Sequence, residues 1–282
     1  MGQHYITQYY LSGFSQIANP SFLWVYEKGR RSIRSLPIKK IAQEKRFYSD
    51  EMESYLANKI EVPANKVLRK IRDLKPISFK EKSILSEYIA VLWKRVPRAK
   101  ERFQAIAPKI SNNLKQDINL KLDELKRKYP NKAELLEKRR IEAQDILDEF
   151  KDKPRKDVWL NVIPPEMTPR ITEALSQMKW VFLVCDEPIT FLTNDNPVFI
   201  HESFGIGKKY SELTFPISSH VTLWATWWNV DREYIDSDNQ VIKEINRRVA
   251  YSATRFVFCS KKRDWIVTLV NKQKHHLHII TP

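Results

Sequence analysis

The chain has few glycines, few cysteines and no long apolar run. Its 282 residues include five glycines and two cysteines. Nucleotide-binding loops need several glycines at fixed spacing, and the sequence contains neither G-x-G-x-x-G nor a P-loop pattern. Cys185 and Cys259 each lie in an apolar segment, which excludes a disulfide framework and argues against a cysteine-ligated zinc site. No stretch of about 18 apolar residues is present, so we expect no membrane-spanning helix.

The N-terminal segment, MGQHYITQYYLSGF, has neither the basic head nor the apolar centre of a secretory signal. We therefore expect a cytoplasmic protein that has no membrane partner. Hydrophobic residues make up 42% of the chain. That fraction is enough for a real core, and it excludes a wholly disordered chain.

Positive charge is concentrated in the first part of the chain. The net charge is +15, and residues 1–114 contain 22 basic residues against 10 acidic ones. The densest part is KGRRSIRSLPIKKIAQEKR, from Lys28 to Arg46, which holds eight basic residues and one acidic residue, Glu44. Trp24 and Tyr26 precede this basic segment, and Phe47 and Tyr48 follow it.

A patch of this kind attracts phosphate-rich polymers through counterion release, and neighbouring aromatic rings can stack on unpaired bases. We therefore predict nucleic acid or another polyanion as a partner. The predicted substrate-binding residues in this segment are Arg30, Arg31, Lys39 and Lys40. The alternative is a solvated basic loop whose charge serves solubility.

The hydrophobic pattern predicts an α+β fold, with a helical N-terminal half packed on a mostly antiparallel C-terminal sheet. A strand is expected at 22–27 and a helix from about Glu51 to Leu74, bent or restarted at Pro63. Ser78 and Glu81 form a capping box for the next helix. The C-terminal half should contain a helix near 169–178, another near 241–254, and strands at Trp180–Cys185, Ile189–Thr193, Val221–Trp228, Phe256–Cys259 and Trp265–Val270.

Residues 114–155 form a distinct charged segment. Leu114, Ile118, Leu122, Leu125 and Tyr129 recur at coiled-coil-like spacing, and Tyr-Pro-Asn at 129–131 then breaks the pattern. We expect a protruding helical hairpin, serving either as a protein-binding arm or as an ordinary helix pair. The whole chain is then one composite domain, with a basic, mainly helical part at 1–113, the hairpin as an insertion at 114–155, and the α+β sheet part at 156–282.

Several polar residues are candidates for chemistry. His4 and Gln8 would share one face of a helix, and histidine titrates near neutral pH. Asp195 and Asn196 lie in the segment TNDNPV, directly after an expected strand. Asp195 could be a base, a metal ligand or a substrate acceptor, and the alternative is a turn held by side-chain-to-backbone hydrogen bonds.

Two charges interrupt apolar helix faces, Glu61 in LANKIEVPA and Arg95 in VLWKRVP. A buried charge needs a partner, so we predict an ion pair between them, which could be purely structural. His275, His276 and His278 suggest a metal site, but no carboxylate lies nearby in the sequence, and a surface strand is the preferred interpretation. The sequence contains no G-x-S-x-G and no H-E-x-x-H.

In their order along the chain, these segments resemble the domain-of-unknown-function 4238 family. The resemblance rests on HYITQYYLSGF, KKIAQEKRFYS, Ile60-Glu61, Arg95-Val96-Pro97, Trp180, TNDNPV, Phe215-Pro216-Ile217-Ser218, and Asn246 before FVFCS. It spans nearly the whole chain except the charged hairpin. The family name carries no activity, but the resemblance marks His4, Gln8, Lys40, Glu61, Arg95, Asp195 and Asn196 as a polar set that could share one cleft.

Three functions fit these observations. The first is a nucleic-acid-binding protein acting as a metal-dependent nuclease, with His4, Glu61 and Asp195 as catalytic residues, and Glu61 and Asp195 as candidate ligands of a divalent metal. Its substrate would also contact Gln8, Arg95 and Asn196. The second is a non-catalytic interaction module in a bacterial defence or regulatory system. The third is an enzyme acting on a small phosphorylated or nucleotide substrate. The sequence defines no other cofactor.

Overall fold

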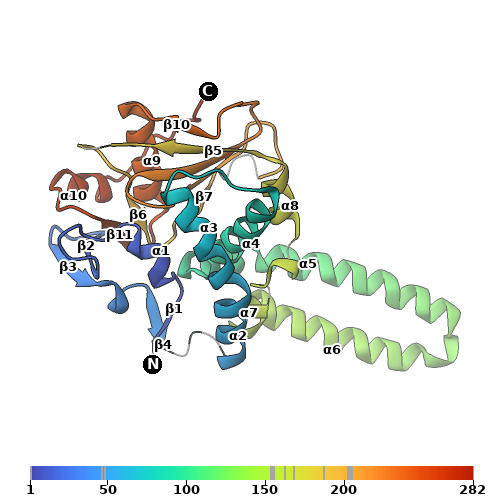
Figure 1. Cartoon of the computed structure of the whole chain (residues 1–282). Helices are drawn as coiled ribbons and strands as arrows, with labels where there is room; N and C mark the ends of the chain where they lie inside the picture. The colour runs from blue at the N-terminus through green and yellow to red at the C-terminus, as the bar shows by residue number, and fades with distance from the viewer. Residues whose placement is uncertain are drawn as a thin grey trace. The chain divides into compact units, whose positions relative to one another are not determined.

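The structure is a computed structural model that describes residues 2–45, 47, 49–152, 156–161, 163–167, 169–186, 188–201 and 206–281. Some sequence predictions fall outside these residues: Arg46 and Tyr48 at the end of the basic segment, the hairpin end at 153–155, and Thr168 before a predicted helix. The fold is α+β, as predicted, with most helices in the first half and antiparallel sheets in the second (Figure 1).

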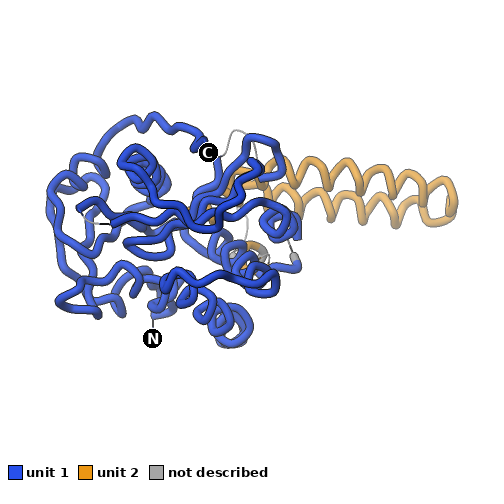
Figure 2. Tube along the Cα trace, turned by 45° about the horizontal axis from the view of Figure 1, so that its top comes forward, with its two compact units in different colours: residues 1–97, 164–282 blue, residues 98–163 orange. Residues whose placement is uncertain are grey.

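The chain forms two compact units, coloured separately in Figure 2. The first unit combines Met1–Pro97 with Pro164–Pro282, and the second is Arg98–Ile163. The hairpin predicted at 114–155 lies inside the second unit. The prediction of one composite domain stays a prediction.

The larger sheet of the first unit has five strands in the order β10-β5-β9-β8-β7. All neighbouring pairs are antiparallel except β10 and β5, which are parallel. Every residue of β8 and β9 is buried, as expected for central strands covered on both faces. The strand bounds are β5 Lys179–Val184, β7 Phe199–Ile200, β8 Glu212–Pro216, β9 Val221–Thr226 and β10 Tyr234–Asp236.

A four-stranded antiparallel sheet, in the order β3-β2-β11-β6, joins the two ends of the chain. Strand β2 (Phe22–Glu27) pairs with β11 (Phe256–Cys259) on one side and with β3 (Ile33–Pro37) on the other. Both β2 and β11 have the predicted bounds. The short strand β6 (Thr193–Asn194) covers only the end of the predicted strand 189–193. A separate two-stranded ribbon pairs β1 (Gly2–His4) with β4 (Gln43–Lys45).

Both helical segments predicted between residues 51 and 97 are present. The predicted helix 51–74 is continuous but contains a π-helical turn, and Pro63 lies in the first turn of α3. The capping box is present, because Glu81 N–H donates to Ser78 Oγ and Ser78 N–H donates to the Glu81 carboxylate. The bounds are α1 Gln8–Ser12, η1 Ile38–Lys40, α2 Asp50–Tyr55, η2 Leu56–Glu61, α3 Val62–Arg72 and α4 Phe79–Arg95.

Helix α9 (Asn239–Ser252) supports both sheets. Ile242 and Ile245 belong to an apolar cluster with β5 and β9, whereas Val249 belongs to a cluster with β2 and β11. Helix α8 (Pro169–Gln177) and the short η4 (Pro165–Met167) precede the larger sheet.

The strand predicted at 265–270 is wrong, because Trp265–Val270 forms a helix, α10. Ile266 and Val270 are four residues apart and are both buried against the α9–β2 cluster. Tertiary packing therefore outweighs the β-propensity of this short, β-branched run. The preferred surface strand around His276 and His278 is also wrong, because residues 272–281 form no strand or helix.

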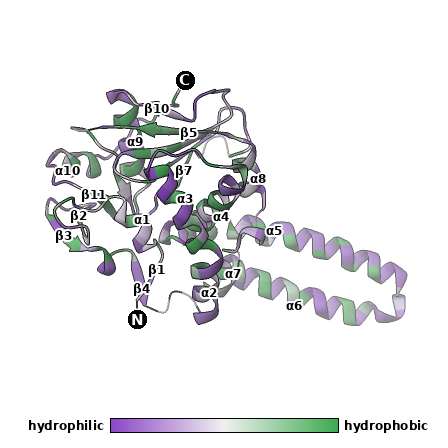
Figure 3. Ribbon diagram, in the orientation of Figure 1, coloured by the Kyte–Doolittle hydropathy of each residue, from purple (hydrophilic) through white to green (hydrophobic). Residues whose placement is uncertain are grey.

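The second unit contains the predicted helical hairpin. Its long helices are α5 (Pro97–Lys128) and α6 (Ala133–Asp152), joined by η3 (Pro130–Lys132) and followed by α7 (Lys156–Asn161). Polar contacts link α5 to α6, including Lys115–Asp148, Lys126–Glu137 and Arg140–Asp123. Leu114 and Leu125 of the predicted apolar seam are 43% and 40% exposed. Figure 3 shows the hydrophilic colour that dominates both helices.

Among the described residues, no helix is long and apolar enough to cross a membrane.

Candidate functional site

Polar side chains from three parts of the first unit line a pocket of about 270 Å³, which we call the His4 pocket. His4 comes from β1, Gln8 from α1, Glu61 from the end of η2, and Arg95 from the end of α4. The pocket is completed by Thr7, Tyr9, Glu53, Leu56, Ala57 and Asn65. Four of the predicted site residues therefore converge.

Buried hydrogen bonds fix the N-terminal wall of this pocket. Thr7 caps α1 by accepting from the Tyr10 N–H, and its hydroxyl lies 3.0 Å from the hydroxyl of Tyr88. The buried Tyr10 hydroxyl donates to the Pro216 carbonyl at 2.8 Å. His4 and Gln8 do not share a helix as predicted, because His4 ends a strand, but both still line the pocket.

The predicted ion pair between Glu61 and Arg95 is confirmed. Arg95 Nη1 donates to Glu61 Oε1 at 2.6 Å, and the Arg95 side chain is 1% exposed while that of Glu61 is 23% exposed. Glu61 ends the π-helical segment η2. Such wide turns insert a residue into a helix and are frequent at functional sites, because they redirect side chains that a regular helix would place elsewhere.

His4 presents a neutral imidazole. Burial lowers its pKa below 6.5, opposed by a hydrogen bond with the Lys39 backbone and by the charge of Glu61. Nε2 is buried and has no hydrogen-bond partner among the described residues, so the bond to Lys39 falls to Nδ1. A ring that donates through Nδ1 carries its lone pair on Nε2. Nε2 is therefore available as a base.

Glu53 was not predicted, yet its carboxyl group is perturbed in the same pocket. Burial raises its pKa, and the negative charge of Glu61 raises it further. Its Oε2 atom and the Oδ1 atom of Asn65 are buried and, like His4 Nε2, have no hydrogen-bond partner among the described residues. Three unused polar atoms on residues that line one pocket indicate a polar ligand, since buried polar groups are normally paired.

Asp195 and Asn196 are not among the residues that line the His4 pocket. Their side chains instead hydrogen-bond to the backbone at the junction of α9 and β11. The Asp195 carboxylate accepts backbone N–H groups from Thr254 and Arg255 at 2.7 Å and from Phe256 at 3.0 Å. Asn196 Nδ2 donates to the Ser252 carbonyl. Burial raises the pKa of Asp195 to about 6, although the three N–H donors oppose that rise. These bonds tie β6 to the α9–β11 junction, in accordance with the structural alternative for this motif.

Asp195 lines a second pocket of about 330 Å³, together with Tyr5, Lys40 and Arg255. Glu61 and Asp195 line different pockets, and each is bonded to protein partners. Among the described residues, no group of three or more His, Cys, Asp or Glu side chains is placed to hold a metal ion.

Most basic side chains of this segment are exposed, but their charges are not equivalent; the exposed ones are Arg30, Arg31, Arg34, Lys39, Lys40 and Lys45. Arg30 lies 3.3 Å from Glu27, which also pairs with Arg34 and Arg255, both at 2.8 Å. Arg31, Lys39 and Lys40 are exposed and pair with no carboxylate among the described residues. The Lys39 backbone supports His4, and Lys40 lines the Asp195 pocket.

Sequence reasoning missed Glu53 and Asn65. Both lie on the same helical stretch as Glu61, so their polar character was visible. Their convergence with Glu61 could not be predicted, because nothing in the residue pattern marks the π-helical turn that separates Glu53 from Glu61. A regular helix would have placed these side chains differently.

Comparison with known proteins identifies the family. A search of curated proteins and a search of solved structures each find no match. One family model, described as "Protein of unknown function (DUF4238)", matches residues 2–263. That range includes every residue of the His4 pocket and most of the chain. The chain belongs to the DUF4238 family.

Proposed function

We propose that the His4 pocket binds one nucleotide unit of a phosphate-bearing substrate, brought to it by the exposed basic segment, and hydrolyses a phosphate ester there. The main support is that three buried polar atoms of this pocket, His4 Nε2, Glu53 Oε2 and Asn65 Oδ1, have no hydrogen-bond partner among the described residues. A volume of about 270 Å³ lies just below the usual range of small-ligand sites, about 300–1,000 Å³. It suits one sugar phosphate or nucleotide, and not a folded polymer.

The proposed chemistry uses two groups whose neutral forms are favoured by burial. His4 Nε2 takes a proton from water, the water oxygen forms a bond to phosphorus, and the ester oxygen leaves. The Glu53 carboxyl group, whose pKa is raised, supplies the proton to that leaving oxygen. Pairs of groups with such shifted pKa values are typical of acid–base sites. Glu61 and Arg95 hold the pocket walls as an ion pair.

Turnover of labelled oligonucleotides and of mononucleotides tests this proposal, with Mg²⁺ and with a chelator in separate arms. His4→Gln should lower kcat by about 10²–10⁴ while changing substrate affinity much less, because a general base acts in the transition state. The control is His276→Gln, which removes an exposed histidine. Full turnover by His4→Gln, or no turnover of any substrate by the unchanged protein, would refute the proposed reaction.

A second candidate is a non-catalytic polyanion-binding module, favoured by the exposed Arg31, Lys39 and Lys40. In that case nucleic acid would bind with strong salt dependence, and pocket variants would leave binding unchanged. A protein partner at the hairpin also stays a proposal, suggested by exposed side chains such as Leu120 and Ile146. All three proposals, namely hydrolysis in the His4 pocket, polyanion binding and a protein partner at the hairpin, assume that the protein is cytoplasmic.

A further inference from the structure

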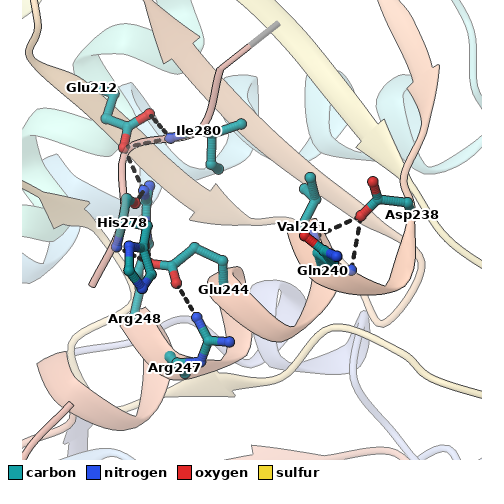
Figure 4. A network of polar contacts seen from close by, with 9 residues as sticks. All are labelled: Glu212, Asp238, Gln240, Val241, Glu244, Arg247, Arg248, His278 and Ile280. Atoms are coloured by element: carbon teal, nitrogen blue, oxygen red, sulfur yellow. Dashed lines mark hydrogen bonds and ion pairs between the residues drawn. The ribbon is translucent and has the colours of Figure 1, made fainter. Parts of the chain in front are cut away.

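A buried ionic network lies far along the chain from the His4 pocket residues. Arg248 of α9 pairs with Glu212 of β8 and with Glu244 one helical turn away (Figure 4). The three residues are 0%, 1% and 5% exposed. Trp224 Nε1 donates to Glu212 Oε2 at 2.7 Å. Buried charges of this kind need full hydrogen bonding.

Part of that bonding comes from residues 275–281, which we call the strap. The His278 N–H donates to Glu244 Oε1 at 2.9 Å, and the His278 carbonyl accepts from Arg248. The Ile280 N–H donates to the Glu212 carboxylate, 3.3 Å from each oxygen. The Ile279 N–H makes no hydrogen bond with any residue that the structure describes.

Alternate residues of the strap, His278 and Ile280, are thus hydrogen-bonded through their backbone. The edge of a β-sheet binds an extended peptide with the same alternation. Here the side chains of Glu212, Glu244 and Arg248 take the place of the edge strand. The groove uses one side chain of the strap as an anchor. Ile280 is 5% exposed and joins the apolar cluster of Val181, Phe191 and Trp224, whereas His278 is exposed. The groove thus recognises the spacing of backbone hydrogen bonds and one apolar side chain.

We propose that Glu212, Glu244 and Arg248 form a peptide-recognition groove, and that the strap is its built-in, releasable ligand. The strap has no helix or strand of its own. It also borders an open pocket of about 590 Å³, shared with Asp238, Lys243 and Arg247 of the α9 region. Release of the strap is a local opening in which water takes the place of its three backbone hydrogen bonds to the network. An extended peptide with an apolar residue two positions after the bonded carbonyl would then fit the groove.

Amide hydrogen exchange on the unchanged full chain tests release. The amides of His278 and Ile280 should exchange at least about tenfold more slowly than that of Ile279, corrected for intrinsic rates. Both should still exchange faster than Leu223 in the middle of β9, which requires global unfolding. Equal exchange at 278, 279 and 280 would refute the docking, and exchange of 278 and 280 at the Leu223 rate would refute separate release.

Peptide binding tests recognition. The receptor is the full chain with Ile280→Asp, which weakens its own strap, and the probe is a fluorescent peptide of sequence His-His-Leu-His-Ile-Ile-Thr. N-methylation at the position of Ile280 should weaken binding at least about tenfold, since it removes a hydrogen bond to a charged group. N-methylation at the position of Ile279 is the matched control and should change affinity less than about threefold.

Equal weakening by the two methyl groups, or no binding of the parent peptide to a folded Ile280→Asp chain, would overturn the recognition groove. Circular dichroism establishes whether that variant is folded. If it is unfolded, the hydrogen exchange of the unchanged chain decides the proposal. Because none of these readouts involves the His4 pocket, failure here leaves the proposed hydrolysis untouched, and the reverse also holds.

Discussion

Burial acts on His4 and Asp195 in the same chemical sense, since it favours the neutral form of each. It lowers the pKa of the histidine and raises that of the aspartic acid to about 6. The difference lies in their bonding. The Asp195 carboxylate accepts three backbone N–H groups of one junction, whereas His4 keeps a ring nitrogen without a partner among the described residues. We therefore propose a role in the reaction for His4 and a structural role for Asp195.

His4 should make the folded chain sensitive to mild acid. Because its pKa in the folded chain lies below 6.5, the unfolded chain takes up the proton first, and stability falls as pH drops through 6.5 and below. His4→Gln removes this contribution. Urea unfolding at pH 7.5 and pH 5 should therefore show a smaller acid loss in the variant than in the unchanged chain. An equal or larger loss in the variant would contradict the burial argument.

Asp195→Asn should destabilise the chain without altering the His4 pocket. An amide offers one oxygen to three N–H donors, and its NH₂ group faces donors. We expect a loss of about 2–4 kcal/mol in unfolding free energy, because buried donors are left unpaired. Nucleotide affinity of the folded variant, measured below its melting temperature, should stay within about twofold. A stable variant that has lost turnover would instead make Asp195 catalytic.

At the scale of elements, the π-helical turn η2 sets the distance between Glu53 and Glu61. Helix α3 after it is anchored by Ala64, Val67, Leu68 and Ile71, whereas α2 before it has no buried residue. A change of register in η2 is therefore expected to move α2 and not α3. Of the two carboxyl groups in the pocket, Glu53 is the one whose position depends on this turn.

Inserting one alanine between Ser54 and Tyr55, in the regular helix α2, should test this dependence. One extra helical residue turns the preceding part of α2 by about 100° relative to α3, and carries Glu53 out of the pocket. We expect turnover to fall as far as in Glu53→Gln, with helix content by circular dichroism unchanged. The control, Ser54→Ala, replaces an exposed residue, keeps the register and should keep activity. An active insertion variant would show that Glu53 is dispensable.

Sequence reasoning succeeded where local chemistry determines the element. The capping box at Ser78, the strands β2 and β11, and the Glu61–Arg95 pair all follow from short patterns or from the need to pair a buried charge. It failed for α10, whose six residues, five of them apolar, are too few to show a period that separates helix from strand. It also missed β3, because a half-exposed edge strand of sequence IRSLP lacks the apolar alternation of a buried strand.

For the whole molecule, the dominant property is an excess of 15 positive charges. If the basic segment holds phosphates, neutralising Arg31, Lys39 and Lys40 to Gln should reduce the slope of log K against log salt for single-stranded DNA by about 2. Fluorescence anisotropy at several salt concentrations measures this. The matched control changes Lys100, Lys121 and Lys138, three exposed lysines of the second unit. Equal effects of both triple variants would mean that net charge alone drives binding.

The ladder between β2 and β11 has a consequence for how the chain is made. It pairs Trp24–Glu27 with Phe256–Cys259, so β2 leaves the ribosome long before its central partner has been synthesised. The His4 pocket needs only residues up to Arg95, but the wall containing α1 is fixed by Pro216. The α5–α6 hairpin, in contrast, is built from local contacts and can form during synthesis. The hairpin can thus be complete while the first unit is still unfinished, because the first unit closes only after β11 has been synthesised.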